Sequence, residues 1–281
     1  MIKNIKDAIA VLLGKANASV IKSKPEIKFR NEEFSVEEME WLNTISIEFL
    51  FAEFGENRTN GGGSSFDDEN RLNPSLKTLK EYFPNAKYTV YSDFDLQIDG
   101  VELIKVTSPV IDPDHPRYGY RTADYYKFMA LVNSKADFKC ILDNDMQIVS
   151  SDIIALIYLT EKFGFCVPYN NRQLLRSDMK ISKDTQDITD ASLGLGQSYN
   201  QSPMTLWKNN ERGQLFYTTC TDIMKKDPSR ASLVMWKSAW KTGIYPYVLP
   251  RQWCVCESDE GIGDEIILHV GHKSVKEYYE K

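Results

Sequence analysis

Two carboxylates one residue apart, Asp143 and Asp145, follow the apolar run Cys140-Ile141-Leu142. A short apolar run that ends in polar residues is typical of a buried strand. Like charges this close repel each other where water is scarce, so something has to compensate them. Mg²⁺ and Mn²⁺ prefer oxygen ligands and often combine one or two protein carboxylates with substrate phosphates. The motif therefore predicts a divalent-cation site, although a solvated turn has the same composition.

A second polar group follows the strand predicted at 265–270. His269 lies at its end, where a neutral imidazole could complete a Mn²⁺ site. Gly271 permits a tight turn, and the start of the following helix presents backbone N–H groups to an anion. Lys273 adds a positive charge there, and His272 could contact phosphate or sugar. These residues predict a diphosphate site; the alternatives are an ordinary strand-edge histidine and a solvated lysine.

Arg121 and Asp124 are three residues apart in a helix predicted at 120–133, so they share one face. Lys127 lies on the same face as Asp124. These residues could form an ion pair within the helix or contact a bound ligand, and the pattern leaves both interpretations open.

The elements that must position these residues alternate between strand and helix over the first 165 residues. Strands are predicted at 44–55, 86–93, 101–108 and 138–142, and helices at 73–83, 120–133 and 151–163. This order predicts parallel strands with helices on both faces of the sheet. Ligands of such sheets bind at the carboxyl ends of the strands, where Asp93 and the Asp143/Asp145 pair would lie. Further along, a strand is predicted at 204–207 and helices at 211–226, at 232–243 and after Gly271.

The chain has 281 residues, enough for one large domain with a small appendage. Its 34 basic and 40 acidic residues give a formal charge of −6, which argues against a nucleic acid as the main partner. The five cysteines are predicted to be small buried side chains in a reducing compartment. Cys254 and Cys256 share one face of a strand, but their spacing does not make a set of zinc ligands.

The N-terminal region, 1–45, is predicted to be helical, with a capping box at Ser35 and Glu38. No apolar run is long enough to cross a membrane, and no signal peptide is evident. These observations predict a cytoplasmic protein, soluble or peripherally associated with a membrane. The amphipathic stretch 1–15 would make that membrane contact, or would pack on the protein's own core.

The run 121–152 resembles the core of the GT-A glycosyltransferases, in which an Asp-x-Asp motif holds a metal ion and a sugar-nucleotide donor. The segment 75–93 resembles that family's first helix and second strand, and 120–131 resembles the helix before Asp-x-Asp. The segment 268–274 is similar to the C-terminal His-x-x-Gly-x-x-Lys of glycosyltransferase family 8, but here His269, Gly271 and Lys273 are closer together. The resemblance covers most of 46–281.

This resemblance implies a GT-A fold, with a Rossmann-like, mostly parallel sheet flanked by helices. An N-terminal helical extension, 1–45, would precede a single domain, 46–281. Its first half, 46–165, would bind the nucleotide sugar and its second half, 166–281, the acceptor.

The implied activity is Mn²⁺- or Mg²⁺-dependent transfer of a sugar, from a UDP-sugar, to a hydroxyl of a glycan or glycoconjugate. The implied metal ligands are Asp143, Asp145 and His269. The implied donor-binding residues are Arg121, Asp124, Asp143, Asn144, Gly271, His272 and Lys273.

An inverting enzyme needs a carboxylate base beside the acceptor hydroxyl, and Asp187 and Asp190 are the candidates. Two alternatives remain: a nucleotidyltransferase on a similar sheet, and a non-catalytic glycan-binding relative. The sequence does not indicate the sugar, the linkage or the oligomeric state.

Overall fold

Strand β1, Ile47–Glu53, is buried along its whole length. Its side chains alternate between two separate cores: Phe49 and Phe51 belong to one, and Leu50 and Ala52 to the other. Successive side chains of a strand point to opposite faces of the sheet, so both faces are covered here. Burial on both faces is what the nearly continuous apolar run of this strand predicts.

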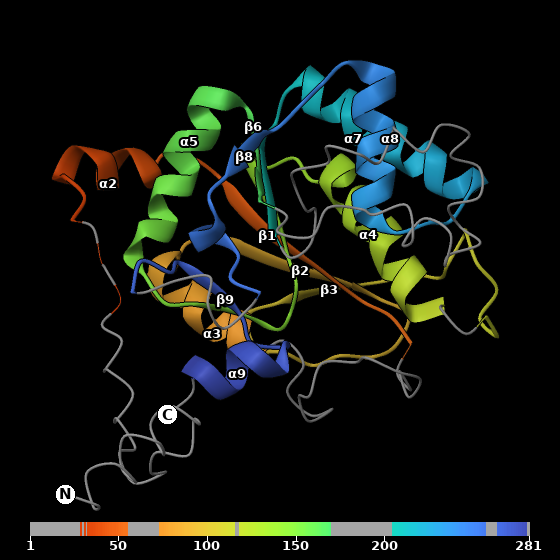
Figure 1. The fold of residues 1–281 in the computed structure, drawn as a ribbon, viewed down its shortest axis with the longest axis horizontal. Helices are drawn as coiled ribbons and strands as arrows, with labels where there is room; N and C mark the ends of the chain where they lie inside the picture. The colour runs from red at the N-terminus through yellow and green to blue at the C-terminus, as the bar shows by residue number, and fades with distance from the viewer. Residues whose placement is uncertain are drawn as a thin grey trace, which may run out of the picture.

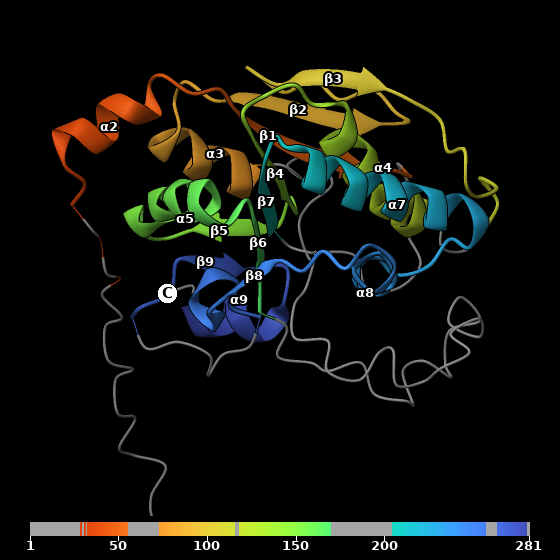
Figure 2. The same ribbon diagram turned by 90° about the horizontal axis from the view of Figure 1, so that it is seen from above.

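The computed structural model describes residues 29, 31, 33–55, 73–115, 118–169, 204–256 and 263–279. Within them, seven strands form one sheet in the order β3-β2-β1-β4-β7-β6-β8 (Figure 2). The other six strands are β2 Lys87–Ser92, β3 Glu102–Lys105, β4 Phe138–Leu142, β6 Phe165–Pro168, β7 Met204–Lys208 and β8 Tyr247–Leu249. Strand β7 runs antiparallel to both of its neighbours, and all other pairs in this sheet are parallel. The predicted α/β fold with a mostly parallel sheet is therefore confirmed.

Helices cover both faces of the sheet (Figure 1). Helices α3, Asn73–Tyr82, and α5, Ala155–Phe163, pack on one face. Helices α4, Tyr118–Asn133, α7, Glu211–Lys226, and α8, Ala231–Thr242, pack on the other. Because β1 runs parallel to both β2 and β4, the carboxyl ends of these three strands lie along one edge of the sheet.

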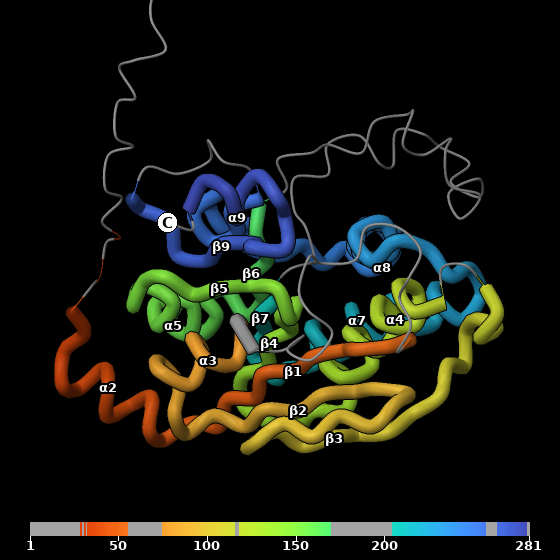
Figure 3. The backbone as a smooth tube through the Cα atoms, turned by 90° about the horizontal axis from the view of Figure 1, so that it is seen from below, coloured from red at the N-terminus to blue at the C-terminus, as the bar shows by residue number. Residues whose placement is uncertain are grey.

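A small second sheet joins distant parts of the chain. Strand β5, Met146–Ile148, pairs antiparallel with β9, Ile267–His269, and Met146 lies opposite His269. Figures 2 and 3 show helix α9, Lys273–Tyr279, beside this pair. Two 3-10 helices, η2 Ser151–Ile154 and η5 Arg251–Trp253, complete the described elements. Strand β9 lies within the strand predicted at 265–270, but the sequence predicted neither β5 nor the pairing of the two.

The described part of the predicted N-terminal extension contains one helix, α2, Val36–Leu42. Its predicted capping box is present: Ser35 Oγ accepts from Glu38 N, and the Glu38 side chain accepts from Ser35 N. The amphipathic stretch 1–15 lies outside the described residues. Within the ranges given above, no helix combines the length and apolarity needed to cross a bilayer.

Candidate metal and donor site

The Asp143-Asn144-Asp145 turn lies between buried strand β4 and strand β5. Ser75, on α3, fixes this turn. Its Oγ lies 2.7 Å from the carbonyl oxygen of Asp143 and accepts a hydrogen bond from Met146 N at 3.1 Å. The buried hydroxyl of Ser75 therefore pairs with backbone groups that have no strand-to-strand hydrogen bond where the chain turns.

The β5–β9 pairing brings His269 to the two carboxylates, although Asp145 and His269 are 124 residues apart in sequence. Ligand atoms of Asp143, Asp145 and His269 all lie within 4.8 Å of one another. His269 Nε2 lies 3.1 Å from Asp145 Oδ2. The three residues predicted as metal ligands thus converge at the carboxyl edge of the sheet.

Gly271 allows Asp145 to approach the β9–α9 turn. A Cβ at this position would lie 1.8 Å from Asp145 Oδ2 and 2.7 Å from Asp145 Cγ. Real Cβ atoms do not approach other atoms this closely. The glycine is therefore required for close packing against a site residue, a stronger reason than the tight turn that the sequence indicated.

Two positive side chains face the carboxylates. Lys127 Nζ, from α4, lies 2.5 Å from Asp143 Oδ1, and His269 contacts Asp145. From the sequence, a metal ion was expected to offset the repulsion between the carboxylates. In the structure these two residues supply positive charge instead, so repulsion alone does not require a metal ion.

Two neighbouring side chains, Asp145 and Cys256, raise the pKa of His269. Burial raises the pKa of Asp145, but the charge and hydrogen bond of His269 outweigh burial, and the pKa ends below its ordinary value. Burial lowers the pKa of His269, while Asp145 and Cys256 together raise it to about 10. His269 is thus held as an imidazolium here, whereas the predicted metal ligand is a neutral imidazole. Metal binding at this site would release a proton.

Arg121 and Asp124 form the ion pair that the sequence left open, with 3.5 Å between Arg121 Nη1 and Asp124 Oδ2. Asp124 Oδ2 also accepts a hydrogen bond from Ala231 N, at the start of α8. Burial raises the pKa of Asp124, and the charges of Lys127 and Arg121 oppose that rise without cancelling it. The pair thus links α4 to α8 beside Lys127, the partner of Asp143.

Two further acidic side chains, Glu53 and Asp93, lie at the same edge of the sheet. Glu53, at the end of β1, is 3% exposed and accepts a hydrogen bond from Asn144 Nδ2. Asp93, after β2, accepts from Gly55 N at 3.0 Å and from Tyr118 Oη at 2.7 Å. Glu53 was not predicted as a site residue; its signal was an acid at the carboxyl end of a mostly apolar strand.

In the described part of the chain, the remaining candidate residues contact groups other than Asp143 and Asp145. Lys273 is exposed and pairs with Glu277 at 3.5 Å. His272 contacts the backbone of Cys256 through Nδ1, at 2.9 Å. Asp187 and Asp190, the candidates for a catalytic base, lie outside the described residues.

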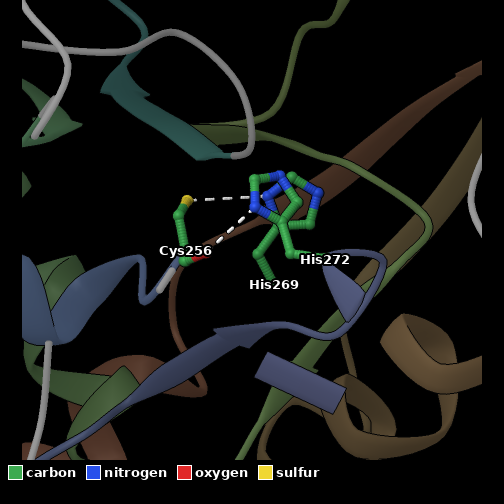
Figure 4. Close-up of side chains that lie close together, drawn as sticks. All are labelled: Cys256, His269 and His272. Atoms are coloured by element: carbon green, nitrogen blue, oxygen red, sulfur yellow. Dashed lines mark hydrogen bonds between the residues drawn. The ribbon is translucent and has the colours of Figure 1, made fainter. Parts of the chain in front are cut away.

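Cys256 is the second site residue that was not predicted. Its Sγ lies 3.7 Å from His269 Nδ1, and the two side chains point toward each other (Figure 4). A hydrogen bond from Cys254 lowers the pKa of Cys256, burial opposes this, and His269 adds to the lowering, giving a pKa of about 5. The Cys254–Cys256 spacing alone gave no hint of a histidine partner.

A cavity of about 480 Å³ lies at the opposite edge of the sheet, near the start of β1. It is lined by Ile47, Tyr82, Asp137 and the segments around them. No group of metal-ligating side chains was found there among the described residues. The carboxyl edge is therefore the better candidate for a reaction site.

No protein-family model and no curated protein matches the sequence. Among solved structures, the chain is similar to the galactosyltransferase LgtC in complex with donor and acceptor sugar analogs. The two share 10% sequence identity, the match covers 74% of each chain, and the TM-score is 0.43. A likeness this distant does not assign the chain to a family.

Proposed function

We propose that this protein is a metal-dependent glycosyltransferase that moves a sugar from a UDP-sugar to a hydroxyl of a glycan or glycoconjugate. The observation that carries the proposal is the convergence of Asp143, Asp145 and His269 at the carboxyl edge of the sheet. Strand ends of α/β sheets are where ligands bind. The resemblance of this motif order to GT-A glycosyltransferases supplies the reaction class.

The donor atoms fit Mn²⁺ or Mg²⁺. Two carboxylates and one imidazole form a set that suits a hard to intermediate divalent cation, Mn²⁺ more than Mg²⁺ because of the nitrogen. Because Gly271 has no side chain, Asp145 has room to occupy its position among these ligands. When bound, the ion supplies Lewis-acid stabilisation of the negative charge that develops on the leaving diphosphate. Asp143, Asp145 and His269 would hold it.

The neighbouring residues have roles that follow from their contacts. Lys127 already faces Asp143 and would add positive charge beside a diphosphate. Asp124, partly buried where α4 meets α8, would accept hydrogen bonds from sugar hydroxyls, with Arg121 holding its orientation. Asn144 is oriented by Glu53.

The other donor contacts and the base are proposed from the sequence resemblance. Gly271, His272 and Lys273 would border the diphosphate, and Asp187 or Asp190 would act as base if the enzyme inverts configuration. On the same resemblance we propose a single domain, 46–281, in which 46–165 binds the nucleotide sugar and 166–281 binds the acceptor.

The experiment that tests this function is turnover of UDP-sugars by purified protein, measured as UDP release with Mn²⁺ and with EDTA. Asp145→Asn should keep the fold and slow UDP release by roughly a thousandfold, because several kcal/mol of stabilisation are lost at about 1.36 kcal/mol per tenfold. Asp99→Asn, at an exposed position, is the matched control and should keep wild-type turnover.

Near-normal UDP release by Asp145→Asn would contradict the metal assignment. Release of pyrophosphate from a nucleoside triphosphate would instead identify a nucleotidyltransferase. Glycan binding without any turnover would identify a non-catalytic relative.

A further inference from the structure

A second group of metal-ligating side chains lies on the other side of His269. Ligand atoms of Cys256, His269 and His272 all lie within 4.8 Å of one another (Figure 4). None of the three is fully exposed. The group contains sulfur and nitrogen, unlike the carboxylate-rich group formed by Asp143, Asp145 and the same histidine.

The backbone places these side chains firmly. Val255 pairs with Leu268 in a parallel bridge, Val255 N donates to Ile267 O, and His269 N donates to Val255 O, both at 2.9 Å. His272 N donates to His269 O at 3.0 Å and closes the turn before α9. Cys256 and both histidines therefore come from adjoining, hydrogen-bonded backbone.

The hydrogen bonds of His272 decide which of its nitrogens can coordinate. His272 Nδ1 lies 2.9 Å from the carbonyl oxygen of Cys256. A carbonyl oxygen only accepts, so Nδ1 carries the hydrogen. In neutral His272 the lone pair is then on Nε2. Fixing one ring nitrogen by a backbone carbonyl is the usual support for a metal-binding histidine.

The distance between Cys256 and His269 fits a tetrahedral zinc site. With Zn–S of about 2.3 Å and Zn–N of about 2.0 Å, two tetrahedral ligands lie about 3.5 Å apart. Cys256 Sγ and His269 Nδ1 are 3.7 Å apart. Thiolate and imidazole ligands favour Zn²⁺ over Mg²⁺ and Mn²⁺.

The sequence spacing agrees with a zinc site in the separation of Cys256 from His269, and it departs from the usual zinc modules in having two residues, not three to five, between the histidines. Twelve residues separate Cys256 from His269, and two separate His269 from His272. Twelve is the separation between the cysteine and histidine pairs in many zinc modules. The Cys254–Cys256 pair does not by itself make a set of zinc ligands. Of these two residues, only Cys256 belongs to the group with His269 and His272.

We propose that Cys256, His269 and His272 form a Zn²⁺ site with an open fourth position. This site does not depend on the proposed transferase activity. A second consequence does rest on that function: a neutral imidazole has one lone pair, so His269 serves one cation at a time. Zn²⁺ on Cys256, His269 and His272 would then withdraw His269 from Asp143 and Asp145 and weaken Mn²⁺-dependent binding of UDP.

Co²⁺ titration of the purified, reduced protein tests the site, because Co²⁺ replaces Zn²⁺ and reports a bound thiolate by sulfur-to-cobalt charge-transfer absorption. Wild-type protein should show this absorption, and excess Zn²⁺ should abolish it. Cys256→Ser should lack it, and His272→Gln should weaken Co²⁺ affinity by about tenfold or more. Asp143→Asn is the matched control and should keep the absorption.

Absence of the charge-transfer absorption in the wild type, or its persistence in Cys256→Ser, would overturn the proposed Zn²⁺ site. The competition is tested separately by titrating UDP with Mn²⁺ before and after addition of Zn²⁺. Weaker UDP binding in the wild type but not in Cys256→Ser is the expected result. If Zn²⁺ weakened UDP binding equally in both proteins, the proposed competition for His269 would be wrong. The Co²⁺ absorption would still test the Zn²⁺ site independently.

Discussion

At the scale of single residues, the candidate site depends on a buried lysine. Lys127 is 7% exposed and contacts Asp143, whose side chain is 18% exposed. Removing one partner of a buried ion pair leaves an uncompensated charge, which costs about 3 kcal/mol at the low end of the measured range. Lys127 therefore stabilises the fold most when no cation is bound to the carboxylates.

Lys127→Met should lower the free energy of unfolding by about 3 kcal/mol in EDTA. Saturating Mn²⁺ should restore part of this loss, because the metal ion would replace the missing positive charge. Urea unfolding in EDTA and in Mn²⁺ measures both effects. Lys105→Met breaks an exposed pair with Asp95 and is the control, with an expected change below about 1 kcal/mol. Equal losses in EDTA and Mn²⁺ would contradict a cation site at Asp143.

Gly271→Ala should displace the carboxylate of Asp145, because the new Cβ would lie 1.8 Å from Oδ2. We expect Mn²⁺ affinity to fall at least about tenfold, measured by calorimetry. Gly243→Ala is the control: Gly243 has a φ of 66°, and nothing lies within 4 Å of a Cβ there. That variant should lose about 1 kcal/mol of stability and keep its Mn²⁺ affinity.

Residue types alone indicated Asp143, Asp145 and His269, because carboxylate and imidazole groups at strand ends are chemically informative. The contacts of Lys127 and Cys256 were not predictable from the sequence. Lys127 reaches Asp143 only because α4 packs against β4, and Cys256 reaches His269 only because its segment pairs with β9. Both contacts are tertiary and leave no local signal.

At the scale of secondary structure, a polar network ties three neighbouring elements together. Glu48 on β1 is 5% exposed and accepts hydrogen bonds from Thr89 on β2, at 2.6 Å, and from Ser134 after α4. Lys87 Nζ lies 3.2 Å from the same carboxylate. Burial raises the pKa of Glu48, but these partners outweigh it and leave the pKa below its ordinary value of 4.5.

A lowered pKa means that folded protein binds fewer protons than unfolded protein near this pH. The contribution of Glu48 is therefore complete above about pH 4.5 and is lost as the pH falls through the folded-state pKa. Glu48→Gln should unfold more easily at pH 7 and should lose less stability on acidification than the wild type. Urea unfolding at pH 7 and below pH 4.5 gives the free energy of unfolding of both proteins. If Glu48→Gln lost as much of this free energy on acidification as the wild type, this role of Glu48 would be contradicted.

The longer elements were predictable because their signals are local. Alternating and apolar runs indicated β1, β2 and β4, and the Ser35–Glu38 capping box indicated α2. Strand β5 has only three residues, too few for a periodic pattern. Its pairing with β9 joins positions more than a hundred residues apart, and neither segment's sequence specifies its partner.

At the scale of the whole molecule, the β5–β9 pair connects the C-terminal segment to the Asp143–Asp145 turn. The candidate site therefore forms only when both halves of the chain are folded. The parallel direction of the strands in the first half was predicted from the alternation of strand and helix, whereas the antiparallel direction of β7 left no signal in the sequence. The acceptor side of the proposed enzyme stays a prediction.

The measurement that tests the central claim most directly is a calorimetric titration of the purified protein with UDP, in Mn²⁺ and in EDTA. The proposed site predicts that UDP binds in Mn²⁺ and binds far more weakly in EDTA, because Asp143, Asp145 and His269 would hold the diphosphate only through the cation. UDP binding of equal strength in both solutions, or none in either, would contradict a metal-dependent donor site at these residues.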